Sequence, residues 1–415
     1  MTANYRTYAE PAEDLTMNIG IQIEHFDPVA GGAERYTEQL VGGLLARGHA
    51  VHVFARTARS LPARTFFHAV PAGGLMRWQK DHSYARNTDA LAGAARLDVL
   101  LSMGKTLAMD VLQPHGGTIR RSQQQNTARI RSNVLRRLKV LFNYINPKQV
   151  LARHDEARQY GRRPLPHVVA VSHMVAGDMQ STYGVPDDRL HVIYNGVDLE
   201  RFHPQRLAAR RSAARQRLGL ADGALVFVLV AHNFKLKGVA ELIAAVALLN
   251  AARSGFQVVI AGKAKARRYQ ELSRRLGCID RILFTGPLGT VEDLYAAADV
   301  YVHPTWYDPC SLVVLEALAS GLPVITTRFN GASEIITEGR EGFLLDTPRD
   351  VEYLADRMGY FFERSRIQPM GIQARSLAQQ FSWDRNVEEM LRVLELAAAQ
   401  KRSRPKAGLA GIGTS

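Results

Sequence analysis

The sequence has little cysteine and no long apolar run. Only two cysteines, Cys278 and Cys310, occur in 415 residues, too few for a disulfide framework or a metal site made of thiolates alone. Such usage fits a protein of the reducing cytoplasm. No apolar run approaches the roughly 20 residues that a membrane-spanning helix needs. Residues 1–16 carry acids where a secretory signal would be basic, and we interpret them as a disordered leader.

Acidic residues are in deficit, since 39 Asp and Glu face 53 Lys and Arg, for a formal net charge of +14. The balance alone fits nucleic acid, an anionic membrane surface or anionic substrates as partners. Its distribution is more informative, because residues 118–167 concentrate positive charge that only Asp155 and Glu156 oppose. The basic residues of this stretch are Arg120, Arg121, Arg129, Arg131, Arg136, Arg137, Lys139, Lys148, Arg153, Arg158, Arg162 and Arg163.

The length of the chain predicts two domains, because one hydrophobic core usually organises roughly 150 to 200 residues. An apolar run at 18–23, a glycine-containing turn at 31–33, a helical pattern through Leu45 and a strand at 51–55 form a βαβ opening. Further strand candidates lie at 99–102, 167–172 and 189–194. This alternation favours a parallel sheet covered by helices.

The second half of the chain repeats this alternation of strands and helices after a charged stretch at 206–217. Strands are predicted at 225–231, 257–261, 282–285, 300–303 and 323–326, with helices at 239–250, 269–276, 291–297 and 311–320. We therefore predict two Rossmann-like α/β domains with doubly wound parallel sheets, each with a crevice at the strand carboxyl ends. The predicted domains are 17–203 and 204–385; a last helix, 386–398, returns to the first, and a basic tail, 401–415, is disordered.

The strongest chemical motif runs from Asp308 through Ser311 and Glu316 to Val324, after a strand that ends at His303. Asp308 lies in the loop before a helix, and Glu316 lies about one and a half turns into it. First-turn amides of a helix are unpaired and carry a partial positive charge, so those near Ser311, Leu312 and Val313 suit a diphosphate. Glu316 can accept from two ribose hydroxyls and Asp308 from sugar hydroxyls. Alternatively, Asp308 and Ser311 only cap the helix and Glu316 is solvated.

A second motif, residues 231–238, joins the first strand of the second domain to a helix. It contains Asn233, Lys235 and Lys237 before Gly238. Lysines at such a turn can neutralise a departing diphosphate. The alternative is an exposed lysine-rich turn.

Two weaker motifs contain paired glycines. Gly31 and Gly32 follow the first strand without completing a dinucleotide-binding fingerprint, and a tight loop without function explains them equally well. His115 precedes two glycines, which is typical of an imidazole held in a turn beside a ligand. A buried histidine with a backbone partner is the alternative there.

Residues 301–336 resemble the donor-site signature of retaining family 4 glycosyltransferases of the GT-B fold, in which two glutamates are separated by seven residues. Asp308 replaces the first glutamate here. Lys237 falls on the family's lysine, whereas Leu236 stands where relatives often carry arginine, and Lys235 substitutes for it. The resemblance runs from Met17 to about Ala398. It is closest to the lipopolysaccharide core glucosyltransferase I group, through 234–238, 297–303 and 321–326.

The resemblance implies a retaining hexosyltransferase that moves glucose from UDP-glucose, its co-substrate, to a lipid-linked saccharide. It implies no bound metal, and no Asp-x-Asp motif is placed to hold one. Its implied catalytic residues are His115, Lys237, Asp308 and, by a looser match, Asp27. Its implied donor-binding residues are Gly31, Gly32, Asn233, Lys235, Lys237, Asp308, Ser311, Leu312, Val313 and Glu316.

The stretch 129–144 predicts a basic amphipathic helix, with Ile130, Val134, Leu138, Leu141 and Ile145 at helical spacing. Such a helix lies on a membrane surface when the core does not need its apolar face. An anionic leaflet contributes about 1 kcal/mol per nearby basic residue, so this patch could hold the protein peripherally on the inner face of the cell membrane. The alternative is a helix packed on the first domain. The patch consists of Arg129, Arg131, Arg136, Arg137 and Lys139.

Two other functions remain open at this stage. A GT-B-fold sugar-nucleotide epimerase would release an altered sugar without needing an acceptor. A nucleic-acid-binding protein would show steep salt dependence of binding, but it leaves the pairing of Asp308 with Glu316 unexplained, so we expect no nucleic-acid partner.

Overall fold

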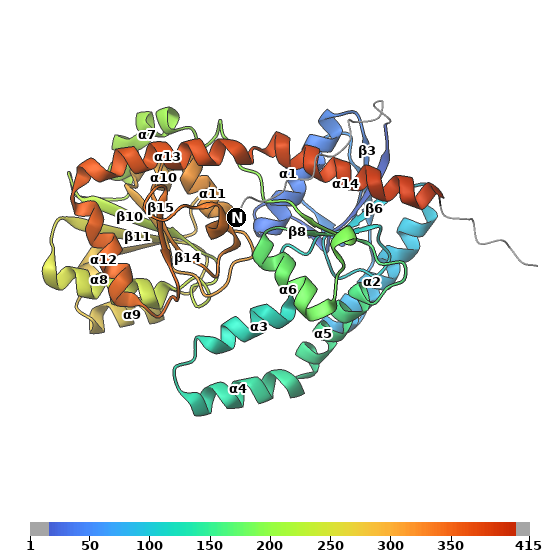
Figure 1. Cartoon of the computed structure of the whole chain (residues 1–415), viewed down its shortest axis with the longest axis horizontal. Helices are drawn as coiled ribbons and strands as arrows, with labels where there is room; N and C mark the ends of the chain where they lie inside the picture. Colours follow the sequence, from blue (N-terminus) through green and yellow to red (C-terminus); the bar gives the residue numbers. More distant parts are fainter. Residues whose placement is uncertain (1–15, 404–415) are drawn as a thin grey trace, which may run out of the picture. The chain divides into compact units, whose positions relative to one another are not determined.

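The computed structural model describes residues 16–403 (Figure 1). Residues 1–15 of the predicted leader and 404–415 of the predicted tail lie outside the described residues. The chain forms two compact units. The first contains residues up to Gln113, 158–169 and those from Val387 onward; the second contains 114–157 and 170–386. The predicted domain boundary at 203 and 204 thus falls inside the second unit.

The first sheet has the strand order β5-β3-β1-β6-β7-β8-β9, and its pairs from β5 to β8 are parallel. The strands predicted at 18–23, 51–55, 99–102, 167–172 and 189–194 are confirmed, whereas β5 and β7 were not predicted. Apolar runs bury both faces of β6 and β8, but β5 is mostly exposed and β9 is half-buried. The division between the units runs through β8, whose last residue belongs to the second unit. The strands are β1 (Asn18–Gln22), β3 (Ala50–Ala55), β5 (Phe66–Ala69), β6 (Val99–Ser102), β7 (Val111–Leu112), β8 (His167–Ala170) and β9 (Leu190–Val192).

The first unit also contains two helices and a separate pair of short strands, all before β6 in the chain. Helix α1 (Gly32–Ala46) buries Tyr36, Leu40 and Leu44. Helix α2 (Arg77–Ala94) packs Tyr84 into a cluster with Phe54 of the sheet. The short strands β2 (His25–Phe26) and β4 (Thr57–Ala58) pair with each other outside the main sheet.

The second sheet has the order β12-β11-β10-β13-β14-β15 and is parallel throughout. Figure 1 shows it between two helical layers, α8, α9 and α12 on one face and α7, α10, α11 and α13 on the other. The predicted fold class is confirmed. The strands are β10 (Leu225–Val230), β11 (Phe256–Ala261), β12 (Ile282–Gly286), β13 (Val300–His303), β14 (Val324–Thr327) and β15 (Gly342–Leu345); the helices are α7 (Pro204–Arg217), α8 (Val239–Ala252), α9 (Arg267–Arg275), α10 (Glu292–Ala297), α11 (Leu312–Ala319), α12 (Val351–Gly359) and α13 (Ile367–Ala378).

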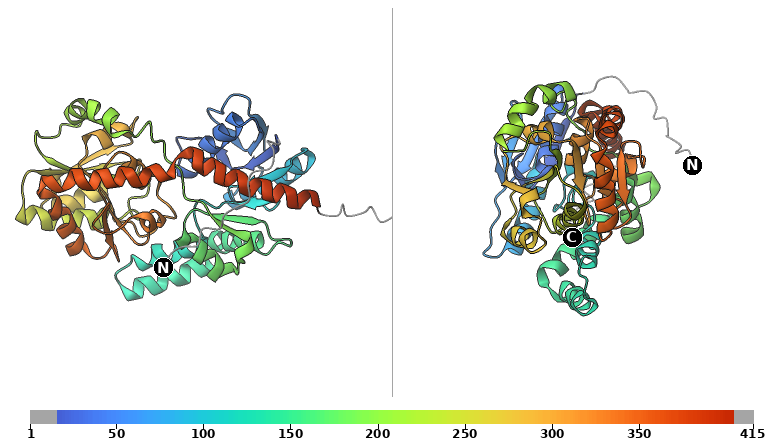
Figure 2. Two further views of the ribbon diagram at one scale, coloured as in Figure 1. Left: turned by 45° about the horizontal axis from the view of Figure 1, so that its top comes forward. Right: turned by 90° about the vertical axis from the view of Figure 1, so that its left-hand side faces the viewer.

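The predicted helix from residue 129 is wrong at its start. Helix α3 (Ile119–Ala128) ends first, and α4 (Asn133–Ile145) begins after a break in which Ser132 accepts a hydrogen bond of 3.4 Å from the Leu135 amide. This N-cap competes with continuation of the helix, so Ile130 lies off the amphipathic face. Figures 1 and 2 show α3 and α4 as neighbours, followed by α5 (Pro147–Tyr160) and α6 (His173–Tyr183).

The charged stretch 206–217, predicted to separate the domains, is the body of α7 on the second unit. Arg211 Nη2 lies 2.6 Å from Asp299 Oδ1. Arg210 and Arg217 lie 2.9 and 2.8 Å from the two carboxylate oxygens of Asp293. The arginines therefore attach α7 to α10 and to the entry of β13.

Helix α14 (Trp383–Ser403) is longer than predicted. Lys401 Nζ donates to Asp110 Oδ2 at 3.0 Å and to the Leu97 carbonyl at 3.2 Å. The disorder predicted from Lys401 onward is thus wrong for 401–403, because the last helical turn is held by these contacts. Among residues 16–403, no helix is long and apolar enough to cross a membrane.

Candidate functional site

Asp308 is fixed in the loop between β13 and α11. Its amide donates to the Phe329 carbonyl at 2.9 Å and its carbonyl accepts from the Gly331 amide at 2.8 Å. Its carboxylate forms an ion pair with Lys237, and His303 Nε2 lies 3.3 Å from the same oxygen, Oδ2. The loop backbone thus aims a buried carboxylate at one lysine and one histidine.

The charges around Asp308 keep it ionised. Burial raises the pKa of Asp308, but the charge of Lys237 and the contact with His303 outweigh it and hold this pKa well below its usual range. Burial lowers the pKa of His303, which favours a neutral ring. Tyr301 Oη lies 3.2 Å from Nδ1 of His303, so a ring that accepts there carries its proton on Nε2, toward Asp308.

Lys237 reaches Asp308 from the turn between β10 and α8. The Asn233 carbonyl accepts from the Lys237 amide at 3.0 Å, and Asn233 Oδ1 accepts from the Leu236 amide at 3.2 Å. Gly238 has φ of +70°, and a Cβ there would lie 1.8 Å from the Pro304 carbonyl oxygen. Only glycine fits this close approach without strain, which brings the lysine turn against the loop after β13.

The amino end of α11 presents unpaired donors beside this carboxylate. Ser311 is the N-cap residue, yet its side chain makes no capping bond, and within the described residues its buried Oγ has no partner. Its own amide donates to Asn330 Oδ1 at 3.2 Å. The amides of Leu312 and Val313 have no helical carbonyl one turn earlier. One hydroxyl and two amides can therefore receive an anion.

Glu316 is buried in the fifth position of α11, which excludes the solvated alternative. Tyr295 Oη donates to its Oε2 at 2.9 Å. Arg201, paired with Glu292 at 2.6 Å, adds nearby positive charge. Burial nevertheless raises the pKa of Glu316 to about 7. A carboxylate kept in such surroundings is suited to accept hydroxyl donors from a ligand.

The glycine turn that follows His115 lies against the same loop. A Cβ on Gly117, whose φ is +65°, would lie 2.1 Å from Tyr307 Oη. Tyr307 immediately precedes Asp308, and its buried hydroxyl has no partner among the described residues. His115 is partly exposed as a residue, but its Nε2 is shielded from solvent, and burial lowers the pKa of the ring to about 3. The imidazole is therefore neutral.

The structure brings only some of the predicted residues together. Lys235 is exposed and lines a cavity of about 50 Å³ with Glu241 and Arg268, and it has no described contact with Asp308. Asn233 shapes the lysine turn. The second unit gathers His115, Lys237, Asp308, Ser311, Leu312, Val313 and Glu316 around the β13–α11 loop.

Three predicted residues belong to the first unit. Asp27 Oδ1 accepts from the Val29 amide at 3.2 Å and so shapes the turn before α1. Gly31 is the N-cap of α1 in extended backbone, a conformation open to any residue, and Gly32 is the first residue of the helix. They form the predicted glycine turn after β1.

Sequence reasoning missed the residues that set the electrostatics. His303 ends the strand before the motif, and its position at a strand carboxyl end is a signal that could have found it. Tyr295, Arg201 and Tyr307 carried no comparable signal, because two of them come from other elements and the third is one aromatic residue among many.

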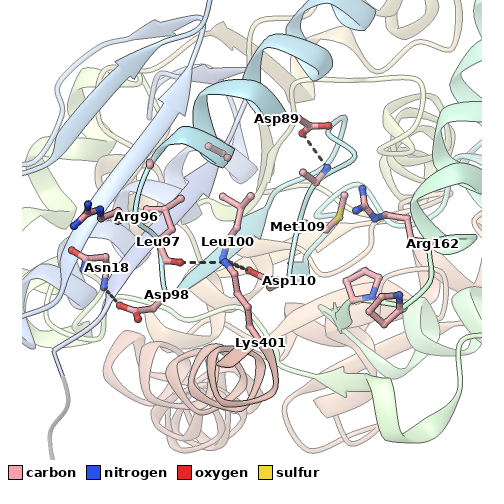
Figure 3. Close-up of a pocket in the computed structure, with 16 residues that line it drawn as sticks. Asn18, Asp89, Arg96, Leu97, Asp98, Leu100, Met109, Asp110, Arg162 and Lys401 are labelled. Carbon is pink, nitrogen blue, oxygen red and sulfur yellow. Dashed lines mark hydrogen bonds and ion pairs between the residues drawn. The ribbon is translucent and has the colours of Figure 1, made fainter. Parts of the chain in front are cut away.

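A larger pocket, about 850 Å³, lies in the first unit at the amino ends of its strands (Figure 3). Asp98 accepts from the Asn18 amide at 2.8 Å, and Asp110 accepts from the Leu100 amide at 3.0 Å. These carboxylates thus satisfy backbone donors. None of the predicted site residues lines this pocket, so we place the chemistry at the β13–α11 loop.

Across residues 16–403, no group of three or more His, Cys, Asp or Glu side chains is arranged to hold a metal ion. The donors at the β13–α11 loop are a lysine, a hydroxyl and backbone amides. These groups suit a phosphate rather than a cation.

Two family models match the chain, one to each half. Residues 30–201 match "Glycosyltransferase Family 4", and residues 210–376 match "Glycosyl transferases group 1". The second match contains Lys237, Asp308 and Glu316.

Curated relatives and solved structures agree with these matches. The D-inositol 3-phosphate glycosyltransferase of Streptomyces scabiei is 33% identical over 222 residues, which are 50% of this chain and 49% of the relative. That of Acidothermus cellulolyticus is 28% identical over 405 residues, 90% of this chain and 87% of the relative. The chain thus spans about half the length of the first of these relatives and most of the other.

The similar solved structures are under 25% identical and bear on the fold alone. The crystal structure of WaaG, a glycosyltransferase involved in lipopolysaccharide biosynthesis, has a TM-score of 0.78 at 20% identity and covers 91% of this chain and 99% of its own. Anabaena Alr3699/HepE in complex with UDP-glucose has a TM-score of 0.66 at 19% identity, over 94% and 100%. The two family matches together span most of the chain and identify it as a glycosyltransferase of the group 1 and family 4 type, whose fold the solved structures share.

Proposed function

We propose that this protein transfers glucose from UDP-glucose to a lipid-linked saccharide, with retention of configuration. The observation that carries the proposal is the convergence of Lys237, the amino end of α11 and the buried Glu316 around one loop. These groups supply a cation and unpaired donors for the diphosphate of a nucleotide sugar, and a carboxylate acceptor for its hydroxyls.

The diphosphate of the donor binds at the amino end of α11. The amides of Leu312 and Val313 and the Ser311 hydroxyl donate to its oxygens, and the helix end favours negative charge. Lys237 neutralises the charge that develops as the nucleoside diphosphate leaves, a role that needs no metal ion. Metal independence is accordingly part of the proposal, and activity in the presence of EDTA tests it.

Two carboxylates fix the rest of the donor. Glu316 accepts hydrogen bonds from the ribose hydroxyls in its ionised form, and donor binding favours that form. Asp308, ionised and held by Lys237, accepts from hydroxyls of the transferred sugar, and neutral His115 contacts the same sugar. Within the first unit, we assign contact with the acceptor to Asp27 and contact with the donor phosphates to Gly31 and Gly32.

The surface of α4 supports a membrane-bound acceptor. Val134, Leu138, Leu141 and Ile145 are each at least 57% exposed, and Asn143 is the one residue of the helix that is buried. The alternative of a helix packed on the first domain is therefore disfavoured. Exposed apolar side chains alternating with Arg136, Arg137 and Lys139 suit an anionic leaflet, on the cytoplasmic side, where UDP-sugars are made.

A phosphorylated inositol is the second candidate acceptor, because curated relatives of this chain bear that activity in their names. Such an acceptor is soluble and gives the exposed face of α4 no role. We therefore favour the lipid-linked saccharide. A sugar-nucleotide epimerase, the remaining enzymatic alternative, would need no acceptor at all.

The test is an incubation of the full chain with UDP-glucose and either membrane lipid extract or D-inositol 3-phosphate. Incorporation of labelled glucose into lipid, with the α-configured donor giving an α-linked product, is the expected result. Incorporation into inositol phosphate would replace the acceptor assignment. Release of an altered free sugar without either acceptor would establish the epimerase instead.

A further inference from the structure

A small cavity of about 50 Å³ lies between the starts of α8 and α9, which are neighbours in Figure 1. Three basic residues line it, and all belong to the second unit: Arg129, Lys235 and Arg268. The first lies in the break between α3 and α4, the second in the turn between β10 and α8, and the third in the first turn of α9. The fold therefore gathers at one place three cations that are far apart in the sequence.

Arg129 is held at the cavity by the backbone around it. Arg349 donates hydrogen bonds to the carbonyls of Ala128 and Ile130, the residues on either side. The guanidinium of Arg349 also lies 5.2 Å from the ring centroid of Trp306, which is buried. The break between α3 and α4 is thus fixed in place, and Arg129, which the sequence put in the basic patch, lines this cavity.

An aromatic pair holds the other two cations. Phe234 precedes Lys235, Tyr269 follows Arg268, and both aromatic side chains are buried. Their rings meet edge to face with the centroids 5.3 Å apart, a favourable geometry for two aromatic rings. The backbone at Lys235 and Arg268 is therefore anchored, while their side chains stay exposed and accessible to a ligand.

The cavity has a surplus of positive charge. Its lining contains one carboxylate, that of Glu241 in the first turn of α8. Burial raises the pKa of Glu241 despite the nearby positive charges of Arg129 and Arg131. In the part of the chain that the structure describes, no carboxylate forms an ion pair with Arg129, Lys235 or Arg268. Three cations thus face one carboxylate, which leaves two positive charges without a balancing group.

The start of α9 adds to this positive potential. Its N-cap residue, Ala266, makes no side-chain hydrogen bond, and its first turn contains no acidic residue. First-turn amides of a helix are unpaired and carry a partial positive charge, which acidic residues ordinarily balance. Here Arg267 and Arg268 occupy that turn instead. A negative charge bound in the cavity compensates both the cations and the helix end.

The size and the charge of the cavity identify the class of ligand. A volume of about 50 Å³ suits one small oxyanion, whereas sites for whole small molecules have about 300 to 1,000 Å³. A phosphate monoester carries roughly −1.5 to −2 charges at pH 7, which matches the surplus. Guanidinium groups pair with two phosphate oxygens at once. Glu241, in the same lining, can accept a hydrogen bond from a hydroxyl beside the phosphate.

We propose that Arg129, Lys235 and Arg268 bind a phosphate monoester carried by the acceptor saccharide. The cavity is distinct from the donor site, because it shares no lining residue with the group around the β13–α11 loop. The identity of the carrier rests on the proposed glycosyl transfer, whereas the binding of phosphate does not. The site therefore acts on acceptor binding and leaves donor hydrolysis unaffected.

The direct test is calorimetric titration of inorganic phosphate into the full chain saturated with UDP, so that the donor site is filled. The wild type is expected to bind phosphate, and Arg268→Gln to bind it about tenfold more weakly, as loss of a charged hydrogen bond implies. Arg267→Gln is the matched control, because the Arg267 side chain is 91% exposed, pairs with Glu271 at 3.1 Å and does not line the cavity. It is expected to keep the wild-type affinity.

Three results overturn the proposal. Absence of phosphate binding to the UDP-saturated wild type would mean that phosphate has no site besides that of the donor. Equal weakening in Arg267→Gln and Arg268→Gln would attribute binding to net charge. Diethyl phosphate, a diester with a single negative charge, is expected to bind at least about tenfold more weakly than inorganic phosphate, and equal affinity would contradict a monoester site.

Transfer assays identify the carrier of the phosphate. Phosphatase treatment of the acceptor, either lipid extract or D-inositol 3-phosphate, is expected to raise its apparent KM for the wild type about tenfold. Arg268→Gln is expected to show no such rise, because it already lacks the contact. An unchanged KM for the wild type with both treated acceptors would overturn the assignment to the acceptor.

The outcome is separable from the proposed glycosyl transfer. UDP-glucose hydrolysis without acceptor is expected to be equal in the wild type and in Arg268→Gln, and its loss in the variant would place the cavity in the donor site and overturn the proposal. Absence of hydrolysis and of UDP binding in the wild type would instead defeat the proposed function. Phosphate titration of the unliganded chain, compared with Arg268→Gln, would then still test the cavity.

Discussion

The hydroxyl of Tyr295 donates a hydrogen bond of 2.9 Å to Oε2 of Glu316 inside the second unit. This bond is insufficient to offset the burial of the carboxylate, because the pKa of Glu316 is raised from 4.5 to about 7. The ionised form therefore destabilises the unliganded fold. A ligand that supplies further hydroxyl donors removes that cost on binding.

The first prediction follows from the sign of this shift. Because the folded pKa exceeds the unfolded one, the destabilisation is absent below about pH 4.5, grows toward pH 7 and is complete above it. A rise from 4.5 to about 7 corresponds to roughly 3 kcal/mol. Glu316→Gln is expected to raise the Tm of the unliganded protein at about pH 8 and to leave it nearly unchanged at about pH 5.

Thermal unfolding across this pH range measures the effect. Glu352→Gln, a change at an exposed position of α12, serves as the control and is expected to show no such pH dependence. A Glu316→Gln protein that is less stable than the wild type at about pH 8 would contradict the burial argument.

The second prediction separates the two lysines of the β10–α8 turn. Lys237→Met removes the cation beside Asp308 and is expected to lower kcat/KM by roughly 10²- to 10³-fold, the usual loss for one electrostatic donor. Lys235→Met, at an exposed position without contact to Asp308, is expected to change kcat/KM less than about threefold. Equal losses of kcat/KM in both variants would show that both lysines stabilise the leaving group and would contradict the assignment to Lys237 alone.

Lys237→Met also leaves the Asp308 carboxylate without its ion-pair partner. The single change is expected to destabilise the fold by about 3 kcal/mol, and Lys237→Met/Asp308→Asn to recover most of this loss. Urea unfolding of the two single variants and the double variant measures the coupling. Additive effects would show that the ion pair does not exist in solution.

The third prediction concerns the glycine that brings the lysine turn to β13. Gly238→Ala places a methyl group 1.8 Å from the Pro304 carbonyl oxygen, at φ of +70°. Gly219→Ala is a matched control, because its φ is +62° and its Cβ meets nothing within 4 Å. The control is expected to lose about 1 kcal/mol of stability from backbone strain alone. Gly238→Ala is expected to lose at least twice as much and to lose donor hydrolysis; similar losses would refute the close approach.

Much of this architecture could be predicted because short apolar strands bounded by glycine turns report directly on a parallel sheet. Strand β6 at 99–102 and strand β13 at 300–303 coincide with their predicted ranges. The position of Glu316 in α11 followed from counting residues after Ser311. These features depend on local periodicity and on one motif.

The remainder depended on contacts between distant residues. The arginines of α7 were predicted to separate two domains, because the acids that pair with them, Asp293 and Asp299, lie more than 75 positions away. Arg201 lies in a loop and Tyr295 in α10, so no residue spacing in the sequence indicated that they lie near Glu316. The break before α4 depends on one N-cap residue, Ser132, within a sequence pattern that otherwise predicts a continuous helix.

The fourth prediction concerns α4. Arg136→Glu/Arg137→Glu is expected to reduce sedimentation with anionic vesicles about tenfold or more, because each arginine contributes about 1 kcal/mol and each glutamate is repelled. Arg274→Glu/Arg275→Glu, at the exposed end of α9, makes the same charge change elsewhere. Equal losses in both double variants would attribute binding to net charge rather than to α4.

We propose that Glu316 and the amino end of α11 bind the nucleotide of the donor. Calorimetric titration of UDP into the wild type and into Glu316→Gln tests it most directly. The wild type is expected to bind UDP, and the variant, still folded, is expected to bind it at least about tenfold more weakly, since hydroxyl-to-carboxylate bonds are lost. Equal UDP affinity in the two proteins would contradict it.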